Sequence, residues 1–220
     1  MLPHNDWTFI HVLNERYPYL QDNFEQAMRI EPEERHDWAL DRVYDILRKR
    51  YTKRGVPAHD TETVGEHILE SIGLATLHTP DHCNRDTVEQ MILVHDMPQA
   101  ITDNIRCEKD ISDTDKYRIR HLAAKVIFEA KPVAYDLWIE YEKQESLESH
   151  IAHDMQNVQM MLKVLEYQSA YPKITPHFQY FWDNLEHRWK TETGREIYRS
   201  TLPANGMDTN LPQNAGEAAA

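Results

Sequence analysis

Apolar residues recur at intervals of three and four along most of this chain, which is the spacing of one face of an α-helix. The longest such segment starts at Ser146 and includes Leu147, Ile151, Val158 and Leu165. Only 6 glycines occur in 220 residues, which is few for a fold with many tight turns. We therefore predict an all-α protein.

Asp154 lies at the centre of that longest stripe, where every other member is apolar. A buried carboxylate is costly unless a cation, a metal or a dense set of hydrogen bonds satisfies it. Two interpretations stay open at this point. Asp154 binds a metal, or it pairs with an arginine or caps a neighbouring helix.

Two histidines lie on or beside other apolar helical faces. His95 falls on the stripe of its predicted helix and is followed directly by Asp96. His67 borders the face of another predicted helix, which Thr63 and Glu66 open with capping-box spacing. Any one of these features alone is typical of a surface dipeptide or a satisfied core histidine. Because they occur on separate helices, we hypothesise that the histidines and acids converge.

Two imidazoles and two carboxylates form a mixed nitrogen and oxygen ligand set. Such a set suits Mn, Fe, Co, Ni, Zn or Mg in open geometry. An open cation can polarise a phosphoryl oxygen and lower the pKa of bound water. The predicted ligands are His67, His95, Asp96 and Asp154.

Charge, cysteine content and hydropathy indicate which partners and which compartment to expect. The net charge of −13 argues against a nucleic-acid-binding surface and against an anionic membrane, although a local basic cluster could still bind a small anion. The 2 cysteines lack CxxC spacing, so a reducing compartment is expected. No signal-peptide pattern and no membrane-length apolar run occur, so we expect a cytoplasmic protein.

Three regions are expected along the chain. Residues 1–35 read as an N-terminal helical extension, residues 36–200 as the main helical domain, and residues 201–220 as a disordered tail. One helix is expected from Pro32 to a closing Gly55, with five basic residues in its last seven positions before the glycine. That basic run is interpreted as a solvated helix end or as an anion-binding patch.

Several short sequence motifs of the chain resemble those of a known family. Glu62-Thr-Val-Gly-Glu-His67 is similar to E-[ST]-V-A-E-H, and the segment from His95 to Ile105 is similar to H-D-x-x-E-A-x-x-G-D-I. Both patterns belong to the HD-domain metal-dependent phosphohydrolases, in their 5'-deoxynucleotidase-like branch. Arg54-Gly-Val-Pro and Trp138-Ile-Glu-Tyr-Glu match further patterns of that branch. The resemblance covers roughly residues 40–170.

The resemblance implies an HD-domain helical bundle and a divalent metal held by the four residues proposed above as ligands. It also implies frequent homodimers and hydrolysis of a nucleotide, with a (deoxy)nucleoside 5'-monophosphate as the expected substrate. Arg48 or Arg54 lies near the position of the family's substrate arginine, and a guanidinium suits bidentate contact with phosphate. Arg48 aligns better of the two.

The chain also departs from the family pattern. Gln99 replaces a glutamate and Asn104 replaces an aspartate, and the family's D-K-x-E becomes Asp154-Met-Gln-Asn157. An amide cannot take a proton, and loss of general-base help typically costs ~10²–10⁴-fold in rate. Asp103 is a neighbouring acid that could substitute, although a shift of one residue turns a helical side chain by about 100°.

Three functions therefore stay open. The first is a metal-dependent nucleotide phosphohydrolase in which Gln99, Asn104 or Asp103 positions water. The second, motivated by the lost acids, is a catalytically weak module that binds or senses a nucleotide. The third is a structural helical protein whose histidines are satisfied within the core.

Overall fold

The computed structural model describes residues 2–105 and 109–204 of the chain. These residues form helices joined by short connections, and among them the only β pairing is one antiparallel bridge between Leu47 and Thr63. The prediction of an all-α protein is confirmed. None of the described helices is both long enough and apolar enough to cross a bilayer.

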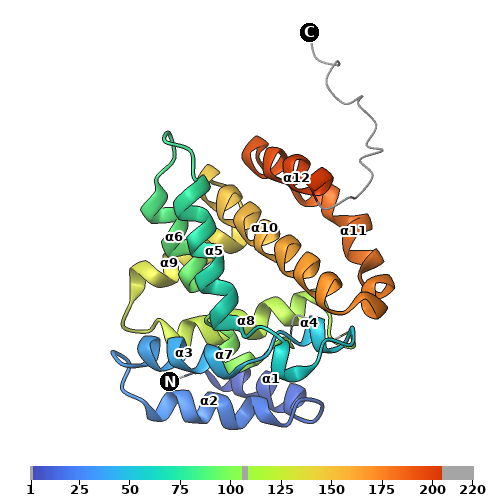
Figure 1. Cartoon of the computed structure of the whole chain (residues 1–220). Coiled ribbons are helices and arrows are strands. Elements are labelled where there is room, and N and C mark those ends of the chain that lie inside the picture. Colours follow the sequence, from blue (N-terminus) through green and yellow to red (C-terminus); the bar gives the residue numbers. More distant parts are fainter. Residues whose placement is uncertain (1, 106–108, 205–220) are drawn as a thin grey trace.

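The first part of the chain, drawn in blue to cyan in Figure 1, lies towards one end of the molecule. Its elements are α1 (His4–Asn14), α2 (Tyr19–Arg29), α3 (Arg35–Arg42), η1 (Val43–Asp45), α4 (Lys49–Thr52) and η2 (Ala58–Asp60). Buried residues of α1 and α2, such as Ile10 and Phe24, share one core cluster with Val64 and Ile101. The extension therefore packs on the body of the protein, and its boundary at residue 35 stays a prediction.

Four long helices form the body of the molecule. They are α5 (Val64–His78), α6 (Arg85–His95), α9 (Pro132–Lys143) and α10 (Leu147–Ala170). Helix α5 packs against α6 and α10, and α6 also packs against α9 and α10. Two helices connect α6 to α9, namely α7 (Gln99–Thr102) and α8 (Asp113–Ile127).

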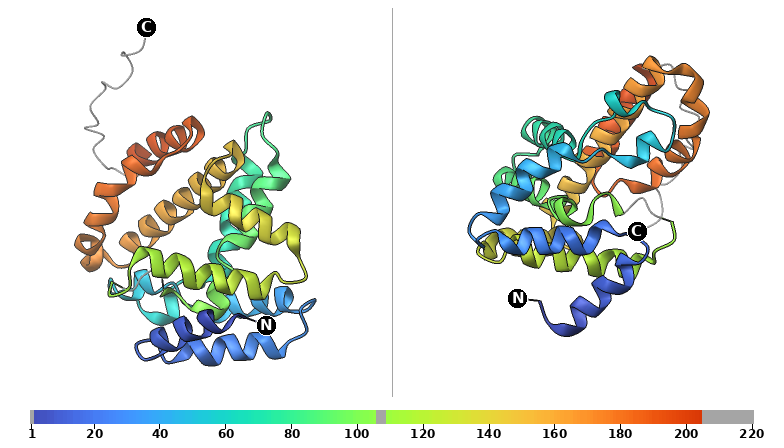
Figure 2. Two further views of the ribbon diagram at one scale, coloured as in Figure 1. Left: turned by 180° about the vertical axis from the view of Figure 1, so that it is seen from behind. Right: turned by 90° about the horizontal axis from the view of Figure 1, so that it is seen from below.

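The C-terminal elements cover one side of α10, as Figure 2 shows from behind and from below. They are η4 (Pro172–Phe178), α11 (Gln179–Leu185), η5 (Glu186–Arg188) and α12 (Glu192–Ala204). Helix α12 thus continues past the predicted start of the tail at residue 201. The rest of the predicted tail, residues 205–220, lies outside the described residues.

Side-chain caps explain several helix starts. Thr63 accepts from the backbone N–H of Glu66, and the Glu66 carboxylate accepts from the N–H of Thr63, so the predicted capping box of α5 is confirmed. The Ser146 side chain caps α10 by accepting from the N–H of Ser149. Helix α6 is capped by Asn84.

The prediction of one continuous helix from Pro32 to Gly55 is wrong. Helix α3 ends at Arg42, and residues 46–48 pair instead with the segment that leads into α5. The N–H of Arg48 donates to the carbonyl of Glu62 at 3.0 Å, and that of Val64 donates to Ile46 at 2.8 Å. These bonds satisfy backbone groups that a helix would otherwise use, and they leave Arg48 only 2% exposed.

Candidate metal centre

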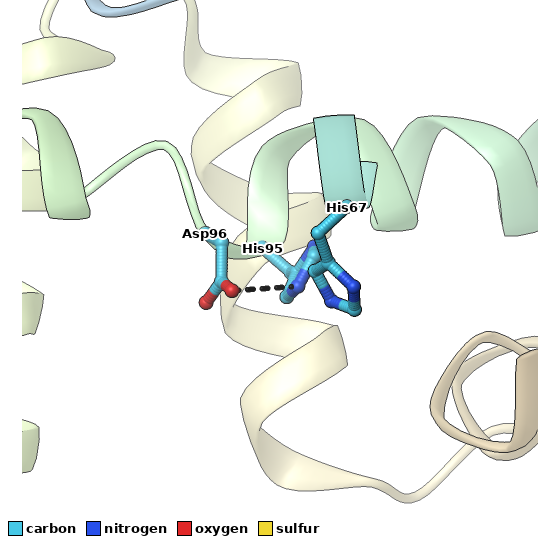
Figure 3. Close-up of side chains that lie close together, drawn as sticks. All are labelled: His67, His95 and Asp96. Carbon is cyan, nitrogen blue, oxygen red and sulfur yellow. Dashed lines mark ion pairs between the residues drawn. The ribbon is translucent and has the colours of Figure 1, made fainter. Parts of the chain in front are cut away.

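His67, His95 and Asp96 lie together in the interior of the protein. One possible ligand atom from each residue lies within 4.8 Å of the other two, and the three residues are 1%, 0% and 5% exposed. Figure 3 shows both imidazoles and the carboxylate beside one another. We call these three residues the trio. Helix α5 supplies His67, and the C-terminal end of α6 supplies the other two.

His67 is held in one orientation by Gln159 on α10. Its Nδ1 lies 2.5 Å from Gln159 Oε1, and because that oxygen only accepts, Nδ1 carries the hydrogen. The Nε2 lone pair is then left for another partner. Burial, together with the positive charge of Arg48, holds the pKa of His67 well below its usual value. The imidazole is therefore neutral, as a metal ligand must be.

His95 is oriented by its own helix. Its Nδ1 lies 2.5 Å from the carbonyl oxygen of Ile92, which fixes the hydrogen on that nitrogen. Its Nε2 is buried and lies 3.2 Å from Asp96 Oδ2, with no hydrogen-bond partner among the described residues. Both histidines thus have Nδ1 engaged in hydrogen bonds and Nε2 as the remaining acceptor.

The C-terminal end of α6, which supplies His95 and Asp96, is held in place by hydrogen bonds to its backbone. The carbonyl oxygen of His95 accepts from Arg120 Nη2 at 3.2 Å and from Trp138 Nε1 at 3.3 Å. Arg120 in turn donates to both carboxylate oxygens of Glu142, at 3.0 and 2.9 Å. The Arg120 guanidinium also interacts favourably with the negative, C-terminal end of the α6 dipole.

The trio fits a divalent cation. Two neutral imidazoles with anchored Nδ1 atoms and one carboxylate form a donor set of the kind that binds such metals, and the Nδ1 hydrogen bonds are the usual outer support of metal-bound histidine. The orphaned Nε2 of His95 is an acceptor that a cation would satisfy. Three protein ligands leave further coordination positions for water or substrate.

The structure does not place Asp154 with the trio, which corrects the predicted ligand set. The Asp154 carboxylate accepts from the backbone N–H of Lys190 at 2.9 Å, and from the N–H and hydroxyl of Thr191 at 2.7 and 2.6 Å. Thr191 immediately precedes α12. The alternative interpretation, a buried aspartate that caps a neighbouring helix, is the one that agrees with the structure.

Two glutamines of α10, rather than Asp154, lie on the side of the two histidines, and neither was predicted as a site residue. Gln159 contacts His67, and Gln156 accepts a hydrogen bond at 2.8 Å from Tyr141, whose ring centroid is 5.1 Å from that of His95. The Nε2 of Gln156 is buried and has no partner among the described residues.

A helical geometry argument explains why Asp154 faces away. Two residues along a helix correspond to a rotation of about 200°, so Asp154 and Gln156 point to opposite sides of α10. The available signal was a second polar stripe on the same helix, formed by Gln156, Gln159, Lys163 and Tyr167 at intervals of three and four.

Gln99 and Asn104 are buried together, each 2% exposed. Asn104 Nδ2 donates to Gln99 Oε1 at 2.5 Å, so the two amides that replace the family's acids are hydrogen-bonded to each other. Helix α6 ends at His95 and helix α7 begins at Gln99, so His95 and Gln99 are not on one continuous helix. Asp103 instead has its carboxylate 2.6 Å from Lys49 Nζ, and the structure does not group it with the trio.

The two candidate substrate arginines lie in different environments. Arg48 is buried and forms an ion pair with Glu62 at 3.2 Å. Gln159 Nε2 donates to the same glutamate at 2.7 Å, so Arg48 is joined to His67 through Glu62 and Gln159. Arg54 lies elsewhere, where it donates to the carbonyl oxygens of His177 and Arg50.

The chain is similar in sequence to several known proteins. A family model described as "HD domain" matches residues 40–197. The 5'-deoxynucleotidase HDDC2 of Xenopus laevis is 28% identical over 134 residues, which cover 59% of this chain and 66% of that protein. The HDDC2 protein of Homo sapiens is 30% identical over 112 residues, which cover 49% of this chain and 55% of that protein. The chain thus spans less than two thirds of either relative.

Solved structures show the same fold. One, described as a predicted metal-dependent phosphohydrolase from Magnetospirillum magnetotacticum MS-1, has a TM-score of 0.60 at 20% identity and covers 80% of this chain and 91% of its own. A conserved hypothetical protein from Pyrococcus furiosus has a TM-score of 0.60 at 21% identity and covers 77% of this chain and 96% of its own.

Proposed function

The chain belongs to the HD domain family, and on that premise we propose that it is a divalent-metal-dependent phosphohydrolase that acts on nucleotides. (Deoxy)nucleoside 5'-monophosphates are the proposed substrates, because the matched relatives are named 5'-deoxynucleotidases. The observation that carries the proposal is the trio, in which two histidines are held with Nε2 free to bind and Asp96 lies beside them.

The trio residues His67, His95 and Asp96 would hold the metal, which supplies a Lewis acid and an activated water when bound. The protein contributes the fixed orientation of its ligands, because Gln159 and the Ile92 carbonyl anchor both imidazoles. Gln99 and Asn104 are proposed to position water by hydrogen bonds, since an amide cannot accept its proton. Metal analysis of the purified protein identifies the native metal among Mn, Co, Fe, Zn, Ni and Mg.

A second candidate is a catalytically weak module that binds or senses a nucleotide. Three buried amides favour it, namely Gln99, Asn104 and Gln156, since none can act as a general base. Asp96 is the only carboxylate in the trio.

A phosphate-release assay separates the two candidates. Purified protein is incubated with deoxynucleoside and nucleoside 5'-monophosphates and with triphosphates, in the presence of Mn²⁺, Co²⁺ or Mg²⁺. We expect metal-dependent release from monophosphates that the Asp96→Asn variant does not catalyse. If nucleotide binds but no metal yields phosphate, the sensing module replaces the hydrolase.

We also propose that the protein is a homodimer and that it is cytoplasmic. Light scattering tests the first, because one chain has a mass of 26.0 kDa and a dimer would have twice that mass. A monomer at micromolar concentration would contradict it.

A further inference from the structure

A cavity of about 540 Å³ lies between α4, α10 and the η4–α11 segment, and none of the trio lines it. Its basic residues include Arg50, Lys53, Arg54 and Arg188, and its exposed aromatic side chain is Tyr180. We call it the basic cavity. The run of arginines and lysines before Gly55, interpreted from the sequence as a helix end or an anion-binding patch, supplies three of these cations.

The charge of this cavity is opposite to that of the chain. The net charge is −13, yet none of the described lining residues is an aspartate or a glutamate, and Lys109 adds a further cation. Like charges that surround a concave site concentrate the field within it and attract a ligand of opposite sign. The cavity therefore favours an anion in a protein whose overall charge repels one.

Arg54 is held in place before any ligand arrives. Its Nε donates to the carbonyl oxygen of His177 at 3.2 Å, and its Nη1 donates to that of Arg50 at 2.6 Å. Its guanidinium carbon also lies 5.9 Å from the ring centroid of Phe178. A guanidinium fixed in this way loses little freedom when it binds a phosphate.

The remaining lining suits an aromatic ring. Tyr180 is 69% exposed, and Phe181 also lines the cavity. The volume falls within the ~300–1,000 Å³ typical of ligand sites, so it has room for more than one phosphate group. Exposed aromatic rings stack readily on nucleobases.

We propose that the basic cavity is a second binding site, separate from the metal centre, for a phosphorylated ligand that carries an aromatic ring, with nucleotides as the ligand class. The arginines and lysines bind the phosphates, and Tyr180 stacks on the ring. Because the cavity does not include the trio, binding there needs no divalent metal. This inference does not depend on the proposed hydrolase activity.

Calorimetric titration of the full chain in EDTA tests the proposal, with ADP and inorganic tripolyphosphate as probes. We expect both to bind. Arg188→Ala should weaken both about tenfold, since a hydrogen bond to a charged group is lost. Tyr180→Ala should weaken ADP at least about fivefold and leave tripolyphosphate unchanged, since stacking contributes only to the ligand with a base.

Two control variants accompany these titrations. Arg85→Ala removes an exposed arginine that does not line the cavity, and it should leave both affinities unchanged. Asp96→Asn changes the trio, and it too should leave binding in EDTA unchanged. Thermal unfolding followed by circular dichroism checks that every variant folds.

Several results overturn the proposal. The site is excluded if neither probe binds at millimolar concentration, or if binding is unchanged in Arg188→Ala and Arg54→Ala. Loss of binding in folded Asp96→Asn would place the ligand at the metal centre instead. Equal ADP affinity of the wild type and Tyr180→Ala would overturn the assignment of the aromatic ring.

Discussion

The two faces of α10 satisfy buried polar groups in different ways. On the face towards α12, Asp154 accepts three hydrogen bonds from Lys190 and Thr191. On the face towards α5, Gln159 joins His67 to Glu62 and Glu70 through hydrogen bonds of 2.5 to 2.7 Å. The Asp154 carboxyl group thus stabilises the fold, whereas the Gln159 amide supports the candidate metal centre.

The difference shows that burial of an acid does not by itself identify a ligand. Asp154 is 0% exposed and so met the condition that suggested metal binding. Hydrogen bonds from the start of α12 meet its need for partners without a cation.

Removing the trio's carboxylate should have the largest effect. Asp96→Asn is expected to weaken divalent-metal binding by at least about 100-fold, since changes to the partners of ligands alone cost 10–100-fold. Metal analysis after dialysis and competition titration measure it. Asp81→Asn, at an exposed aspartate outside the trio, is the control and should retain metal. Unchanged metal content in Asp96→Asn would contradict the centre.

Asp154→Ala should instead reduce stability. It leaves the backbone N–H of Lys190 and the buried N–H and hydroxyl of Thr191 without their acceptor, and we expect the free energy of unfolding to fall by about 3 kcal/mol. Denaturant titration measures this loss. Asp136→Ala, at an exposed position of α9, should have little effect. The folded Asp154→Ala protein should bind metal with wild-type affinity, and a loss of metal would restore Asp154 to the ligand set.

Gly194 tests the same face of α10 from the side of α12. A Cβ at this glycine would lie 2.5 Å from Asp154 Oδ2, so Gly194→Ala should lower the free energy of unfolding by about 2 kcal/mol. A Cβ at Gly73 in α5 meets nothing within 4 Å. Gly73→Ala is therefore the matched control, and it should raise stability by about 0.5–1 kcal/mol. Equal effects of the two changes would mean that the close approach to Asp154 is absent.

Gln156→Asp should place a carboxylate on the face of α10 opposite to Asp154. Its side chain approaches Tyr141 beside His95, so an added negative charge should strengthen metal binding about tenfold, because affinity rises with the number of charged ligands. Competition titration against a metal indicator measures the change. Gln156→Asn, which shortens the side chain without adding charge, should not strengthen binding. A weaker metal affinity in Gln156→Asp would show that residue 156 lies outside the coordination sphere.

The smallest expected effect is on pH dependence. Burial raises the pKa of Asp154, although its hydrogen bonds from Thr191 and Lys190 oppose the shift. With a folded-state pKa above the unfolded value, the stabilising contribution of this group is largest below the unfolded pKa and is lost as the pH rises through the folded one. The stability of wild type relative to Asp154→Asn should therefore be greater at pH 4 than at pH 7. Denaturant titrations at both pH values measure the difference, and the opposite trend would contradict the raised pKa.

Much of the architecture could be predicted from the sequence. Apolar spacing identified the all-α class, the capping box placed the start of α5, and sequence motifs identified the HD domain family. His67, His95 and Asp96 were grouped correctly because each lies on or beside an inward helical face.

Other features depend on contacts that no local pattern describes. The predicted helix is interrupted at residues 46–48 because these residues pair with the segment around Thr63. Helical periodicity does not describe such a contact. Periodicity shows that Asp154 is buried but does not show that α12 is what covers it. Gln156 and Gln159 were not predicted as site residues because amide side chains were considered only as replacements for the family's acids. Gln159 in fact uses its amide both as an acceptor and as a donor.

The amide of Gln159 also sets the electrical balance behind the metal centre. Glu62 is paired with Arg48, Glu70 is paired with Lys163, and the side chain that connects both glutamates to His67 carries no charge. The four charges of these two pairs sum to zero, and Lys163 has a further, more exposed partner in Glu166. A glutamate at position 159 would bring a third negative charge into contact with the other two, and an additional proton would have to enter the network to restore neutrality.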